Sequence, residues 1–139
     1  MLIQKIILRV NEVFLLSVGF VQLVSELLSH FVGAGPLGGR FTASPYTIGF
    51  FEAHGLAVLI GILMFNASLE NPKRFWHLFA VSVHLLLGGA NIVFWDSFVT
   101  LDFIPAGIIA TIFHSLFIIA QTGCYVQAKA ETVSNETFA

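Results

Sequence analysis

The segment Phe75–Trp95, which reads FWHLFAVSVHLLLGGANIVFW, decides the fold. It carries no Asp, Glu, Lys or Arg, and it is as long as the stretch of about 20 residues that a helix needs to cross the hydrocarbon core of a bilayer. Its polar residues His77, His84 and Asn91 recur at intervals of seven, which places them within about 60° of arc on one side of a helix. An apolar helix with one narrow polar stripe is expected to cross a membrane beside other helices.

Three further segments are equally apolar, so the sequence predicts four spanning helices. The predicted spans cover roughly residues 13–33, 46–67, 75–96 and 105–127. The breaks between them contain helix-stopping residues, with Pro45 and Pro105 at the starts of the second and fourth spans. Short connections favour antiparallel neighbours. We therefore expect an all-α, up-down-up-down bundle over residues 1–129 and a polar, frayed tail over residues 130–139.

The composition supports an integral membrane protein and excludes several other classes. Of the 139 residues 57% are apolar and 10% are charged, whereas a typical soluble domain has about 25% charged residues. A soluble domain of this size has too little interior to bury so much apolar surface. The net charge of −2 argues against nucleic-acid binding, and the single cysteine, Cys124, excludes an intramolecular disulfide.

The basic residues set the expected orientation. Lys5, Arg9, Lys73, Arg74 and Lys129 fall on one side of the predicted bundle, and Arg40 falls on the other. Because basic residues concentrate in cytoplasmic loops, we expect both termini and the 66–74 loop in the cytoplasm. The prediction is a multi-pass protein of the inner or plasma membrane, surrounded by the lipid bilayer. The sequence leaves open whether it has membrane or redox partner subunits or forms a homo-oligomer.

Polar stripes also run along the first and fourth spans. The first span has a polar face about 100° wide, made of Asn11, Glu12, Gly19, Gln22, Glu26, Ser29 and His30. The fourth has Gly107, His114 and Gln121 at intervals of seven, with Thr111 and Tyr125 alongside. Ionisable groups are costly in lipid, so the stripes should face one another as a polar seam through the bundle. At a rise of about 1.5 Å per residue, His84 and His114 lie near its midplane.

The second span carries two ionisable residues that cannot share one pocket. Glu52 and His54 are two residues apart, so about 200° separates them on a regular helix. Gly61 lies on the side of His54, and Gly55 lies nearer Glu52. We favour Glu52 as the interior residue, because a carboxylate tolerates lipid less well than a neutral imidazole.

For function, the seam favours a pocket or proton relay for a small membrane-soluble or redox ligand, such as a quinone. Buried carboxylates and histidines exchange protons with such ligands, and aromatic walls with a few convergent polar groups are typical of ligand pockets. Whether the protein is an enzyme is left open. The candidate residues are Gln22, Glu26, Glu52, His84, Asn91 and His114.

Three alternatives remain at this point. His84 and His114 match in depth, so they are candidate axial ligands of a b-type haem in an electron-transfer protein. The second alternative is a purely structural seam, as in an assembly subunit whose helices associate through small residues and interhelical hydrogen bonds. Glu26 and His30 with a third ligand have the ligand types of a metal site, but the Glu-x-x-His motif of di-iron bundles is absent, so no metal is assigned.

Two motifs resemble those of the DoxX-like membrane proteins, a group of small four-helix bundles. They are RVNEVFLLSVGF at Arg9–Phe20 and EAHGLAVLIG at Glu52–Gly61. The resemblance covers the first half of the chain through these motifs and the second half through hydropathy alone. It implies a membrane subunit associated, in some members, with quinone-linked redox chemistry. It does not account for His84 and His114.

Overall fold

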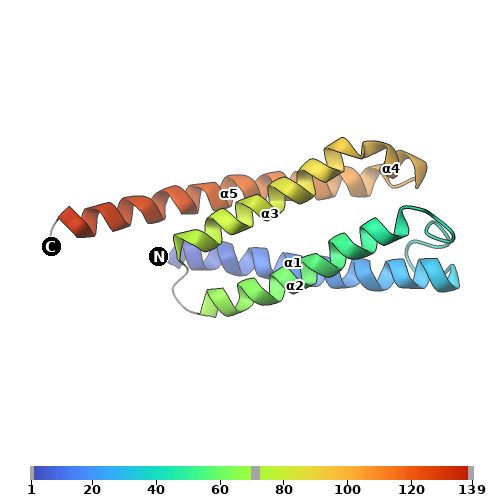
Figure 1. Ribbon diagram of the computed structural model, residues 1–139, viewed down its shortest axis with the longest axis horizontal. Helices are drawn as coiled ribbons and strands as arrows, with labels where there is room; N and C mark the ends of the chain where they lie inside the picture. Colours follow the sequence, from blue (N-terminus) through green and yellow to red (C-terminus); the bar gives the residue numbers. More distant parts are fainter. Residues whose placement is uncertain (1, 70–72, 138–139) are drawn as a thin grey trace.

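The computed structural model describes residues 2–69 and 73–137, with side chains as far as Ala128, and all regular structure in these ranges is helical. The elements are α1 (Leu2–Val32), α2 (Thr47–Leu69), α3 (Arg74–Val93), α4 (Trp95–Thr100) and α5 (Ile104–Thr137). The four long helices run in alternating directions, and α1 begins at the same end of the molecule where α5 ends (Figure 1). The all-α prediction is confirmed. By length and composition, each long helix can cross a membrane.

The boundaries differ from the predicted ones at α1 and at both ends of α5. Helix α1 begins at Leu2, well before residue 13, because Gln4, Leu8, Asn11 and Leu15 continue one buried face at helical spacing. The third break is not irregular throughout, since Trp95–Thr100 forms the short helix α4. The tail expected to be frayed continues α5 as far as Thr137. Within the second break, residues 70–72 lie outside the described residues.

The long helices form two hairpins, α1 with α2 and α3 with α5, which lie side by side (Figure 1). Glycines allow close approach inside each hairpin. A Cβ added at Gly61 of α2 would lie 2.8 Å from Leu16 Cγ of α1, and one at Gly88 of α3 would lie 3.0 Å from His114 Cβ of α5. Small residues at such contacts are typical of helices that associate without a hydrophobic driving force between them.

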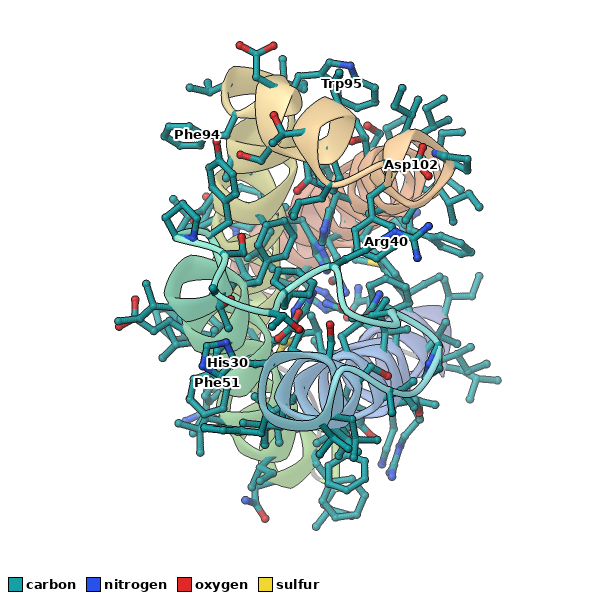
Figure 2. The ribbon with its side chains drawn as sticks, turned by 90° about the vertical axis from the view of Figure 1, so that its right-hand side faces the viewer. His30, Arg40, Phe51, Phe94, Trp95 and Asp102 are labelled. Atoms are coloured by element: carbon teal, nitrogen blue, oxygen red, sulfur yellow. The ribbon has the colours of Figure 1, made fainter. Side chains whose placement is uncertain are left out.

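A loop closes the end of the molecule that carries α4. Gly33, with φ +66°, ends α1 in the left-handed conformation that favours glycine. Residues 34–46 then fold across the hairpins. Phe41 is 1% exposed and packs in an apolar cluster with Leu37 and Leu101. Beside this cluster Arg40 donates to Asp102 at 3.3 Å, joining this loop to the segment after α4 (Figure 2).

The distribution of side chains is inverted relative to a soluble protein. Among the residues whose side chains are described, the buried ones comprise eleven polar and twelve apolar residues. Large apolar side chains point outwards along every long helix; for example, Phe31, Leu86 and Ile119 are 76%, 73% and 70% exposed. A protein that folded in water would bury these side chains first. The surface therefore suits an apolar surrounding, and the polar groups lie between the helices.

The close approach at Gly61 is testable by overpacking. Gly61→Val should destabilise the fold by about 1–3 kcal/mol, because the added atoms meet Leu16 on α1. Gly123→Val is the matched control, since a Cβ at this exposed position in α5 meets nothing within 4 Å. Free energies of unfolding in detergent micelles would measure both variants. Equal effects of the two substitutions would show that α1 and α2 do not pack as described.

Candidate functional site

A chain of hydrogen bonds joins the two hairpins at the centre of the molecule. His84 Nε2 lies 2.7 Å from Asn11 Oδ1, and His84 Nδ1 lies 2.8 Å from His114 Nδ1. The amide oxygen can only accept, so His84 donates from Nε2. With His84 neutral, its Nδ1 accepts the proton carried by His114 Nδ1. The chain links α1, α3 and α5, and Phe117 stacks on the His84 ring at 4.8 Å between centroids.

A second polar layer lies nearer the end where α1 begins. His77 Nδ1 lies 2.6 Å from Gln121 Oε1, and both side chains are fully buried. His77 and Gln121 precede and follow His84 and His114 by seven residues, and buried Gln4 precedes Asn11 by the same interval. Two polar layers at the same seven-residue spacing thus stack along the bundle. His77 Nε2 and Gln121 Nε2 have no hydrogen-bond partner.

Inside the first hairpin, two carboxylates on α1 bond to α2. Glu12 accepts from Ser68 Oγ at 2.5 Å and lies 3.2 Å from Arg9 Nε. Glu26, 1% exposed, accepts from His54 Nδ1 at 2.5 Å through its Oε1. The second oxygen, Glu26 Oε2, is buried and has no partner. Glu26 therefore keeps one acceptor atom available in an apolar setting.

That carboxylate lines a pocket of about 460 Å³ between the end of α1 and the start of α2. Its apolar walls are Leu27, Phe31, Ile48 and Phe51, all exposed on the outside of the first hairpin. Its polar groups belong to Glu26, His30, Ser44 and Thr47. His30 and Phe51 lie together on one side of the molecule, away from Arg40 and Asp102 (Figure 2). We call this site the outer pocket.

The loop fixes His30 in the outer pocket. His30 Nδ1 donates to the carbonyl oxygen of Phe41 at 3.1 Å, and Thr47 Oγ1 lies 3.0 Å from the same oxygen. Ser29 Oγ accepts from the Phe41 backbone N–H at 3.0 Å. The backbone of Phe41 is thus hydrogen-bonded to Ser29 and His30 of α1 and to Thr47 at the start of α2. The orientation of the imidazole depends on this loop.

The preference for Glu52 as the interior residue of the second span was wrong. Glu52 is exposed, and its neighbour His54 faces α1 and bonds to Glu26. The rotation of α2 is set by Ala57, Gly61, Met64 and Ser68, which are all buried against the rest of the bundle. They lie on the side of His54. The position of Gly61 on that side was the signal in the sequence, and the close packing at Gly61 outweighs the cost of exposing the Glu52 carboxylate.

The other predicted residues lie at several places in the bundle. Of the six candidates, Glu26 alone is among the residues lining the outer pocket. His84 and His114 belong to the central chain. Gln22 and Asn91 are half-buried, and Asn91 Nδ2 has no hydrogen-bond partner. The residues that sequence reasoning missed are Gln4, Ser68 and the interior role of His54.

The two central histidines do not have the arrangement of haem ligands. Axial imidazoles must leave room for the iron and its porphyrin between them. Here the His84 and His114 nitrogens are hydrogen-bonded directly, Phe117 covers the His84 ring, and Gly88 brings α3 against His114. A metal site on Glu26 and His30 is not formed either, since no three His, Cys, Asp or Glu side chains cluster among the described residues.

Comparisons with known proteins add no assignment. No protein-family model, no curated protein and no solved structure matches this chain.

The central chain predicts a measurable coupling across the hairpins. Asn11→Leu leaves the His84 Nε2–H without its acceptor and should destabilise the fold by about 0.6–2 kcal/mol, the range for interhelical hydrogen bonds in membrane proteins. In the double variant Asn11→Leu/His84→Phe, the loss of unfolding free energy should be smaller than the sum of the losses in the two single variants. Unfolding in mixed micelles measures both. Ser82→Ala is the control, because exposed Ser82 bonds only to Leu78 of its own helix. Strict additivity would contradict the coupling.

Proposed function

We propose that this chain is a multi-pass membrane protein that binds a small, membrane-soluble, quinone-type ligand in the outer pocket. The observation that carries the proposal is Glu26. Glu26 is one of the residues that line the pocket, it is 1% exposed, its Oε1 is bonded to His54, and its Oε2 is buried without a partner. A buried carboxylate with an unused acceptor is costly unless a ligand or water satisfies it.

The size and walls of the outer pocket support a ligand of this class. Its volume of about 460 Å³ lies within the range of about 300–1,000 Å³ typical of small-molecule sites. Leu27, Phe31, Ile48 and Phe51 give it an apolar wall on the outside of the first hairpin. In the proposed arrangement that side faces lipid. A ligand with an apolar tail and a polar ring enters from the bilayer, with its ring directed to Glu26 and His30.

The charges support the orientation expected from the sequence. Lys5, Arg9, Lys73 and Arg74 lie at the end where α1 begins, and Arg40 lies at the end closed by the loop. Under the positive-inside rule the first end is cytoplasmic. The outer pocket then opens in the leaflet remote from the cytoplasm. Membership of the DoxX-like group is part of the proposal, and quinone-linked chemistry in some of its members agrees with this ligand class.

The orientation is testable by cysteine labelling in a Cys124→Ala background, which removes the native thiol. Thr100→Cys, exposed in α4, should react with a membrane-impermeant maleimide added to intact cells. Lys73→Cys, exposed at the start of α3, should react only after the membrane is permeabilised. Labelling of Lys73→Cys in intact cells, or protection of Thr100→Cys, would show that the orientation is reversed.

Ligand binding is testable by filling the pocket. Ile48→Trp, at a wall position that is 67% exposed, should weaken binding of decyl-benzoquinone and decyl-benzoquinol at least tenfold without unfolding the protein. Ile62→Trp is the matched control, since it lies on the same helix, is 50% exposed and does not line the pocket. Calorimetric titration of the protein in lipid nanodiscs measures both. If neither compound binds the wild type, or Ile48→Trp binds as tightly, the outer pocket is not the site and a structural bundle is favoured.

A further inference from the structure

We infer that the outer pocket selects the reduced, hydroxyl-bearing form of its ligand, a quinol, over the oxidised quinone. The inference rests on the proposed function, because it concerns the same pocket. It follows from which polar atoms of the pocket can donate hydrogen bonds and which can only accept. A quinone offers two carbonyl acceptors and no donor, whereas a quinol offers two hydroxyl donors.

Glu26 presents an acceptor. His54 Nδ1 lies 2.5 Å from Glu26 Oε1, so the proton of this contact lies between these two atoms. Glu26 Oε2, which has no partner, is then an acceptor with no proton of its own. A hydroxyl group satisfies this atom, and a carbonyl oxygen placed there would be repelled by it.

His30 presents a second acceptor. Its Nδ1 faces the carbonyl oxygen of Phe41 at 3.1 Å, and a carbonyl oxygen cannot donate. The proton of the neutral imidazole is therefore on Nδ1, and Nε2 carries the lone pair. The Phe41 carbonyl that fixes this tautomer is itself held in place through the bond from the Phe41 N–H to Ser29. The loop thus fixes the hydrogen-bonding character of His30.

The hydroxyl groups of Ser44 and Thr47, which also line the pocket, do not supply enough donors to offset the acceptors on Glu26 and His30. Thr47 Oγ1 faces two carbonyl oxygens, those of Phe41 and Ser44, both at 3.0 Å, so its proton is engaged. Ser44 Oγ accepts from the Tyr46 backbone N–H at 3.3 Å and keeps a proton that it can donate. None of the residues that line the pocket is Lys or Arg. Among the side chains that line the pocket, there are therefore two fixed acceptors, on Glu26 and His30, and one hydroxyl donor, on Ser44.

The excess of acceptors over donors among these side chains predicts how the affinities of the quinol and the quinone compare. A quinol can donate to Glu26 Oε2 or to His30 Nε2 while its ring oxygens accept from Ser44. Among the side chains that line the pocket, a quinone can accept from Ser44 alone, and it leaves the buried oxygen of Glu26 unpaired. Sites whose buried polar groups are left unpaired by an analogue reject that analogue strongly. We therefore expect the quinol to bind at least tenfold more tightly than the quinone.

The test measures decyl-benzoquinol and decyl-benzoquinone separately, without oxygen, on the full chain in nanodiscs. A tenfold preference for the quinol raises the two-electron midpoint potential of the bound couple by about 30 mV. The dimethyl ether of the same decyl hydroquinone, which has the ring and tail but no donor, should bind as weakly as the quinone. This compound excludes an effect of redox chemistry in the assay.

Variants assign the preference to the named carboxylate. Glu26→Gln replaces an acceptor by an amide that also donates, so the ratio of the two affinities should fall towards one, whereas Glu52→Gln, exposed on the other side of α2, should leave it unchanged. Binding of both forms with equal affinity, or tighter binding of the quinone, would overturn the inference and leave the proposed pocket standing. Failure of either form to bind would overturn the proposed function itself.

Discussion

The fold depends on one constraint: a polar group surrounded by apolar residues must find its hydrogen-bond partner inside the protein. In this chain the partner usually lies on another helix. Glu12 bonds to Ser68 and Glu26 to His54 within the first hairpin, and His77 bonds to Gln121 within the second. These pairs fix the rotation of each helix. With few buried apolar side chains to direct packing, the hydrogen bonds and the close contacts at glycine decide how the helices meet.

The hydrogen-bonded link between the hairpins is smaller, and at the centre of the bundle it consists of the contact between His84 and Asn11, although the polar layer in which it lies has a second one beside it. Asn11, His84 and His114 form one layer, and Gln4, His77 and Gln121 occupy the same places seven residues away, about 10 Å along the bundle. Two helical turns separate the layers on all three helices, so one arrangement of neighbouring helices brings both together. A polar residue at such a position specifies register as well as stability. The repetition at intervals of seven therefore has a structural explanation that needs no ligand.

The sequence predicted the features that follow from helical periodicity, and it missed those that depend on the loop over residues 34–46. Four helices and the inward position of His77, His84 and His114 follow from hydropathy and from the spacing of residues on one span. The choice between Glu52 and His54 depended on which face of α2 packs against α1, and the packing of Gly61 outweighed the charge of the carboxylate. The outer pocket was not predicted, because its imidazole is oriented by Phe41, and the path of residues 34–46 has no periodic signal.

The polar groups at the centre and those at the outer pocket differ in how completely they are hydrogen-bonded. At the centre the ring nitrogens named in the His84 chain are matched, donor to acceptor, and aromatic rings cover them. At the outer pocket, the carboxylate of Glu26 has a hydrogen-bond partner on one oxygen only, and the other oxygen is buried without one in a residue that lines the pocket. His77 and Gln121 also carry unpaired atoms, but they do not line the outer pocket. A fold that depends on internal hydrogen bonds thus leaves one buried acceptor unpaired beside a cavity with apolar walls, and the proposed ligand would supply the missing partner.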